Sequence, residues 1–65
     1  MQKTYRKILY EELQRLVYKE NFKLNYANDI LELFDDEIND GHSDSTAYDK
    51  AMQDIDNVQN GEWDL

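Results

Sequence analysis

The sequence contains no cysteine, no proline, one histidine and two glycines among its 65 residues. The lack of cysteine excludes disulfides and zinc–thiolate sites, and a single histidine excludes a histidine-based metal site. A domain of this length buries only about 60% of the surface that its unfolded chain exposes, and small domains usually compensate with a cross-link, a metal or a partner. We therefore expect a partner, either a second copy of the chain or another protein.

Long apolar runs are also missing from the sequence. No stretch of about 18 apolar residues is present, so we expect no membrane-spanning helix. Glu11 and Glu12 interrupt the segment that would form the apolar part of a signal peptide. Because the absence of cysteine also fits a reducing compartment, we expect a cytoplasmic protein.

Basic residues are nearly absent after residue 25. The chain has 15 Asp and Glu against 7 Lys and Arg, which gives a formal net charge of −8. Residues 1–25 hold six cations against three acids, a balance of +3, whereas residues 26–65 hold Lys50 alone against twelve acids, a balance of −11. This charge opposes direct binding to nucleic acids and to anionic membranes, so we expect neither as a ligand.

Apolar residues recur at the three- and four-residue spacing of amphipathic helices. The pattern predicts an all-α fold, a single small domain with a three-helix arrangement. The expected helices cover residues of about 3–19, 27–39 and 45–59, and a short acidic tail covers 60–65. The expected N-caps are Thr4 for the first helix, Asn25 for the second, and Ser43, Asp44 or Ser45 for the third.

The segment between the first two expected helices has a different pattern. Phe22, Leu24 and Tyr26 alternate with polar residues, a period of two that indicates an extended connection packed on the core. Asn21 is expected to end the first helix in the left-handed conformation, and Gly41 is expected to do the same for the second. We expect Phe22 to cover a helix end.

Side chains that would perform catalysis or bind a metal are scarce, so we expect neither an enzyme nor a bound cofactor. His42 falls in a turn, where histidine is usually solvated. If Gly41 is placed at the glycine of a calcium-binding EF-hand loop, Ile38 and Ala47 fall on ligand positions, so the motif fails. Ser45 precedes an acid by four residues, an S-x-x-x-D spacing that also occurs in a small bacterial family of aspartyl-phosphate phosphatases, but we interpret this serine as a helix cap.

The second expected helix has a wholly acidic solvent face. Its acidic residues opposite the apolar stripe are Asp29, Glu32, Asp35, Asp36 and Asp40. Carboxylates three and four residues apart on a helix lie about 5–6 Å from one another, a repeat comparable to that of DNA phosphates. Such a face is able to imitate a nucleic acid and occupy a basic cleft. The alternative is a solvated face that only keeps the protein soluble.

Three apolar residues are candidates for contact with a partner. Tyr18 and Leu33 lie off the apolar stripes of their helices, and tyrosine is frequent at the energetic centres of interfaces. Trp63 has two possible roles, either as a residue that folds back on the core or as a detachable anchor.

These observations predict a small acidic helical protein that inhibits or regulates a nucleic-acid-binding protein by occupying its basic surface, in the manner of a DNA mimic. In size and charge it is similar to phage anti-CRISPR and other anti-defence proteins encoded by phages and mobile elements. The predicted partner-binding residues are Asp29, Glu32, Asp35, Asp36, Asp40, Tyr18, Leu33 and Trp63. The alternative is a self-associating assembly or accessory subunit, a homodimer paired through the broad apolar face of the first helix.

Overall fold

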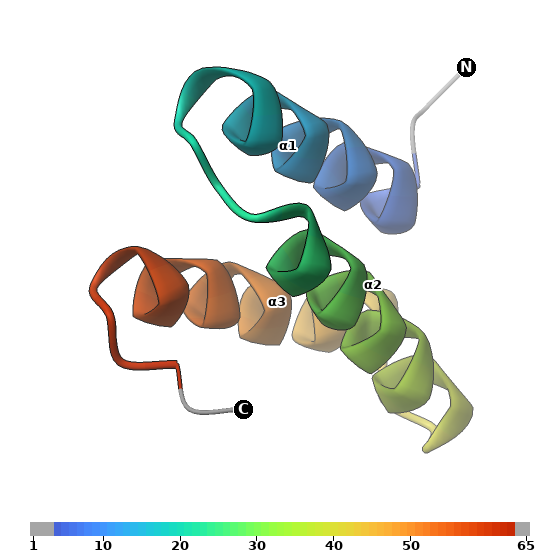
Figure 1. Ribbon diagram of the computed structural model, residues 1–65. Helices are drawn as coiled ribbons and strands as arrows, with labels where there is room; N and C mark the ends of the chain where they lie inside the picture. Colours follow the sequence, from blue (N-terminus) through green and yellow to red (C-terminus); the bar gives the residue numbers. More distant parts are fainter. Residues whose placement is uncertain (1–3, 64–65) are drawn as a thin grey trace.

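The computed structural model describes residues 4–63, which form three α-helices joined by short connections (Figure 1). The helices are α1 (Tyr5–Lys19), α2 (Leu24–Asn39) and α3 (Asp44–Gln59). The predicted all-α, three-helix arrangement is therefore confirmed. Lys3 of the predicted first helix, and Asp64 and Leu65 of the predicted tail, lie outside the described residues.

Each helix contacts the other two, and the most extensive contact is between α2 and α3. Figure 1 shows α1 above the other two helices and α2 crossing obliquely in front of α3. The Cα trace extends over 30 × 29 × 15 Å along its principal axes. Because the axes of packed helices lie about 8–10 Å apart, the shortest dimension corresponds to two layers of helices with one core between them.

The core is a single cluster of apolar side chains to which all three helices contribute. The buried residues are Leu9, Leu13, Leu16, Phe22, Ala27, Ile30, Phe34, Ala47, Ala51 and Ile55. No polar or charged residue among residues 4–63 is buried. The hydrophobic effect on this cluster is thus the main force that holds the helices together.

Hydroxyl side chains cap two of the helices, as their sequences predict. The Thr4 hydroxyl accepts a hydrogen bond of 3.1 Å from the Lys7 backbone N–H at the start of α1. Of the three candidates for α3, Ser43 is the cap, and its hydroxyl accepts a hydrogen bond of 3.2 Å from the Thr46 backbone N–H. Both caps satisfy N–H groups that lack a partner in the first helical turn.

The predicted start of α2 was wrong. The helix begins at Leu24, three residues before the expected start, and its N-cap is Lys23, whose side chain makes no capping hydrogen bond. Residues two apart on an α-helix point about 200° apart, so an alternation of Leu24 and Tyr26 also arises when the two residues lie on opposite sides of one helix. Phe22 is the only apolar member of the alternation that lies in the connection, where it is buried.

The predicted helix ends are confirmed. Asn21, which follows α1, has a φ of 56°, and Gly41, which follows α2, has a φ of 96°. After Gly41 the chain folds back, so that the backbone N–H of His42 donates to the Glu37 carbonyl at 3.1 Å. None of the helices within residues 4–63 is long and apolar enough to cross a membrane.

The small core makes stability sensitive to each buried side chain. We expect Ile30→Ala to lower the free energy of unfolding by about 2–5 kcal/mol, because Ile30 is fully buried and its truncation leaves a cavity. A domain of this length has a total stability of roughly 3–10 kcal/mol. Leu24→Ala should cost less than about 1 kcal/mol, since Leu24 is 61% exposed. Urea unfolding followed by circular dichroism measures both, and equal losses would contradict the position of the core.

The uncapped start of α2 leads to a stabilising substitution. We expect Lys23→Ser to raise the melting temperature by several degrees, because a serine N-cap is worth about 0.5–2 kcal/mol. The loss of the exposed Lys23 ammonium, 5.9 Å from the centre of the Tyr26 ring, offsets about 0.5 kcal/mol of this gain. Lys19→Ser should lower the melting temperature slightly, since Lys19 lies in the last turn of α1, where the helix dipole favours a cation. If both variants shift in the same direction, α2 does not begin at Leu24.

Candidate functional site

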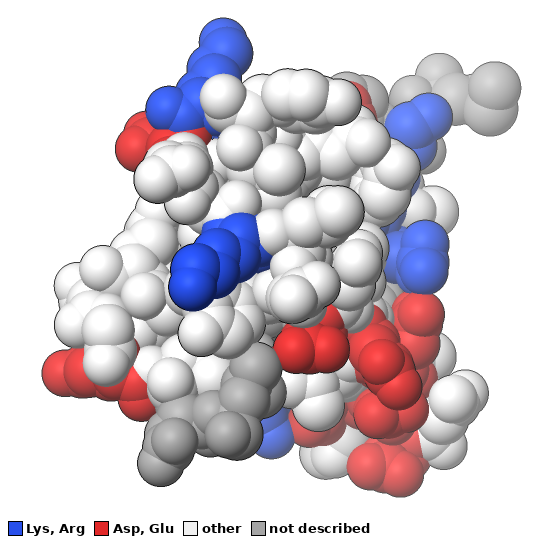
Figure 2. Space-filling view, in the orientation of Figure 1, with Lys and Arg blue, Asp and Glu red and all other residues white. Residues whose placement is uncertain are grey.

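One face of α2 carries a row of carboxylates around an apolar side chain. Asp29, Glu32, Leu33 and Asp36 line a shallow hollow of about 260 Å³. Asp40 follows Asp36 one turn later on the same side. We call these five residues the acidic stripe. Figure 2 shows acidic side chains gathered over the second half of α2.

The four carboxylates of the acidic stripe have no cationic partner in the part of the chain that the structure describes. Glu32, Asp36 and Asp40 are exposed, and Asp29 is partly buried. Their charges are balanced only by solvent and salt. They are therefore available to cations of another molecule.

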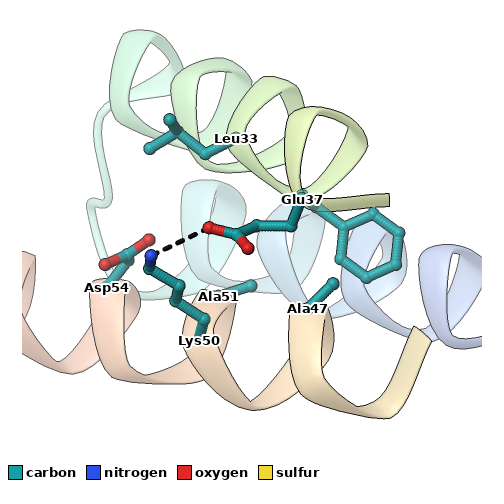
Figure 3. A pocket seen from close by; sticks show the side chains of 7 residues that line it. Leu33, Glu37, Ala47, Lys50, Ala51 and Asp54 are labelled. Carbon is teal, nitrogen blue, oxygen red and sulfur yellow. Dashed lines mark hydrogen bonds and ion pairs between the residues drawn. The ribbon is translucent and has the colours of Figure 1, made fainter. Parts of the chain in front are cut away.

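Leu33 lies at the junction of two hollows. It is 42% exposed. Besides the hollow of the acidic stripe, it lines a second one of about 130 Å³ between α2 and α3, together with Ala47 and Ala51 (Figure 3). An apolar centre within a polar rim is the usual composition of a protein interface.

Asp35 lies apart from the acidic stripe, although the sequence placed it in the same acidic face. Arg6 of α1 donates to both of its carboxylate oxygens, from Nε at 2.9 Å and from Nη2 at 3.1 Å. This two-point pairing is the strongest arrangement of an arginine and a carboxylate. Asp35 therefore serves to join α2 to α1.

Tyr18 lies in a different place, on an apolar groove between α1 and α2. It is 84% exposed, the largest value among the large hydrophobic residues of the described chain. The groove has a volume of about 240 Å³, and we call it the α1/α2 groove. Its lining residues are Tyr10, Leu13, Gln14, Val17, Tyr18, Leu24, Ala27, Asn28 and Leu31. In Figure 2 the surface over the middle of α1 is uncharged, with Lys and Arg side chains at both ends of α1 and beside the start of α2.

Trp63 packs back on the core. Its ring lies 6.5 Å from that of Tyr26, with an angle of 30° between the two planes, and it is partly buried against the core cluster. The sequence left two roles open for Trp63, and in the structure its side chain folds back on the core. Trp63 does not lie in the hollow of the acidic stripe or in the α1/α2 groove.

A cluster of charged residues between α2 and α3 was not among the predicted site residues. Lys50 of α3 donates to Oε1 of Glu37 at 2.8 Å, and Nε2 of His42 lies 3.2 Å from Oε2 of the same carboxylate. Figure 3 shows the Lys50–Glu37 pair below Leu33, with Asp54 beside Lys50. The signal that pointed to this cluster was the isolation of Lys50, the one cation after residue 25.

The pKa values of the two carboxylates in this cluster, Glu37 and Asp54, are shifted in opposite directions. The hydrogen bond from Lys50 lowers the pKa of Glu37 below its usual value of 4.5, and the charges of Lys50 and His42 add to this effect against the cost of desolvation. Burial raises the pKa of Asp54 above its usual value of 3.8, and the nearby Glu37 charge adds to this, whereas Lys50 opposes it. Lys50 thus stabilises the ionised form of Glu37, whereas the ionised form of Asp54 lowers the stability of the folded protein.

Among residues 4–63 no three His, Asp or Glu side chains converge so that they would hold a metal ion. A comparison with known protein families, curated proteins and solved structures finds no match for this chain. The candidate site is therefore defined by surface geometry and charge alone, as the acidic stripe and the adjacent α1/α2 groove.

The opposite pKa shifts lead to a pH-dependent difference between two variants. At pH 7 we expect Glu37→Gln to destabilise the protein and Asp54→Asn to stabilise it. The contribution of Glu37 is fully present above pH 4.5 and is lost as the pH falls through its lowered folded pKa. The cost of Asp54 is present above its raised folded pKa and vanishes below pH 3.8. Thermal unfolding at a series of pH values from 7 to about 3 measures both effects.

Asp56→Asn is the control for this experiment, since Asp56 is exposed on α3 and forms no ion pair in the described structure. It should change the melting temperature little at any pH. A stabilising effect of Glu37→Gln at pH 7 would contradict the pairing of Glu37 with Lys50.

Proposed function

We propose that this protein is an acidic binding protein that occupies a basic surface of a nucleic-acid-binding protein and thereby inhibits or regulates it. The observation that supports this proposal is the acidic stripe, in which four carboxylates without an internal cation surround the exposed Leu33. Charges of this kind accelerate association with a cationic partner, and an apolar centre adds affinity that salt does not screen.

The spacing of the stripe suits a surface that binds nucleic acid. Asp29 and Asp40 are separated by about 16 Å of helix, which gives one carboxylate roughly every 5 Å. A DNA strand carries one charge per 3.4 Å along the axis, so the stripe is a sparser row of anions than DNA. The helix holds its carboxylates in a fixed row, however, and three or four Lys or Arg side chains of a phosphate-binding cleft are able to meet them.

The proposal extends to the biological setting of such proteins. Small acidic proteins that imitate nucleic acid are typical of phages and mobile elements, whose anti-CRISPR and other anti-defence proteins are similar to this chain in size and charge. The formal net charge of −8 on 65 residues is the property shared with that class. Inhibition of a defence protein is the form of the proposed function that we favour.

The alternative function, self-association through α1, has less support. Part of the broad apolar face of α1 is explained within one chain, because Leu9, Leu13 and Leu16 are buried in the core shared with the other two helices. Tyr5 packs on Tyr48 of α3, with ring centres 5.3 Å apart. This part of the face therefore requires no second copy.

A matched pair of variants tests the proposed function. The triple variant Asp29→Asn, Glu32→Gln, Asp36→Asn removes three charges from the acidic stripe. We expect it to bind the partner roughly tenfold more weakly, since three exposed ion pairs at about 0.5 kcal/mol each are lost. Its stability should be unchanged or higher, because repulsion between neighbouring carboxylates is relieved. The measurement is affinity capture from a cell lysate at low and moderate salt, followed by titration of the captured protein.

The control removes the same number of charges elsewhere, by Asp49→Asn, Asp56→Asn and Glu62→Gln, all at exposed positions outside the stripe. The control should keep full affinity. Added duplex DNA or RNA should release the captured partner, because both ligands compete for one basic surface. Equal binding by the two triple variants, or a complex that nucleic acid leaves intact, would contradict the proposal.

A further inference from the structure

The α1/α2 groove is an apolar feature of the surface that the proposed function does not explain. Tyr18 and Leu24, on opposite walls of the groove, are 84% and 61% exposed, and Tyr10 is 44% exposed. Other partly exposed apolar residues have partners or lie singly, whereas these three line one cavity of about 240 Å³. Exposed apolar side chains that converge on one groove mark a binding site more often than single ones do.

The groove contains few polar groups that would bind a polar ligand. Gln14 donates a hydrogen bond of 2.8 Å to the hydroxyl of Tyr10, so these two polar groups of the α1 wall are paired with each other. Its walls are helices, whose backbone groups are already paired, and they offer no edge to an extended strand. An occupant must therefore bind through apolar side chains.

The two walls of the groove are flanked by opposite charges. Lys7 and Arg15 lie three residues before Tyr10 and Tyr18 of the α1 wall, so the negative charge that meets a cationic ligand is on the α2 side. Asn28 lines the groove, and Glu32 of the acidic stripe follows it by four residues, so the two side chains are neighbours on α2. Asp29 and Asp36 extend the row of negative charge from there. A ligand in the groove thus has apolar contacts on one side and a line of unpaired carboxylates along its flank.

The length of the groove fits a helix. Tyr10 and Tyr18 are separated by about 12 Å along α1, at 1.5 Å per residue. Apolar anchors at positions i, i+4 and i+7 of an amphipathic helix extend over about 10 Å. Two or three anchors of one helix therefore fit between the two tyrosines.

We propose that the α1/α2 groove binds a basic amphipathic helix of the partner, with apolar anchors against Tyr10, Tyr18 and Leu24 and with Lys or Arg side chains against Glu32 and its neighbours in the acidic stripe. This inference rests on the proposed function and specifies it. The partner's docking element is a helix with a cationic flank, and charge complementarity with the stripe sets its orientation in the groove.

Three labelled peptides of identical length serve as probes, and fluorescence anisotropy measures their binding to the full chain. The first places leucine at i, i+3, i+4 and i+7 with lysine on one flank, the second has the same composition in scrambled order, and the third replaces lysine with glutamate. We expect the first to bind at least tenfold more tightly than the second. The third should not bind.

Variants of the protein separate the groove from the stripe. Tyr18→Ser with Leu24→Ser should weaken the amphipathic peptide at least fivefold and leave the scrambled peptide unchanged. Ile8→Ser is the matched control, since Ile8 is 38% exposed on α1 but does not line the groove. It should leave both peptides unaffected. Circular dichroism confirms that each variant keeps its helices.

The possible failures are distinguishable. If the ordered and scrambled peptides bind equally and the triple variant of the acidic stripe weakens both, the groove inference is overturned while the proposed function stands. If no basic peptide binds and the stripe variant behaves as wild type, both are overturned. A dimer in sedimentation velocity that Tyr18→Ser with Leu24→Ser abolishes would assign the groove to a second copy of the chain and would also overturn the inference.

Discussion

The contact of three helices through one small apolar core is the constraint on which the other features of this protein depend. The core consists of ten buried side chains, and no polar group is buried among the described residues. With so few buried side chains, each helix buries a narrow apolar strip and exposes most of its circumference. The remaining positions of each helix therefore form the surface of the protein. A binding surface is able to form on these helices without an insertion or a long loop.

The central position of α2 explains how its carboxylates are divided among different roles. On one flank Asp35 pairs with Arg6 of α1, and on the other Glu37 pairs with Lys50 of α3. Two of the seven Lys and Arg residues, Arg6 and Lys50, are thus used where helices meet. Among the carboxylates of α2, those of the acidic stripe are the ones without such partners in the described structure. The stripe lies between the α1/α2 groove and the hollow that Leu33 shares with α3.

Helical periodicity was sufficient to predict the three helices, two of their caps and the shared face of Asp29, Glu32 and Asp36, because these depend on local spacing. The start of α2 was missed because an alternation that includes Leu24 is compatible with both a strand and a helix. The separation of Asp35 from the stripe was not predictable, since it depends on Arg6, which lies 29 positions away in the sequence and reaches α2 only in the folded chain. The α1/α2 groove was not predictable for the same reason, because its walls belong to two helices that come together only in the folded chain.

The acidic stripe also has a cost to the helix that carries it. Like charges at three- and four-residue spacing destabilise a helix by about 0.2–0.5 kcal/mol per pair. Carboxylates near the C-terminus of a helix oppose its dipole, and α2 has no basic residue in its last turn to offset them. A chain with so small a core has little stability to lose, and local rules are usually broken in this way where a surface has a function. A solubilising role requires no apolar centre, whereas the row around Leu33 beside an apolar groove fits the cationic, partly apolar partner that we propose.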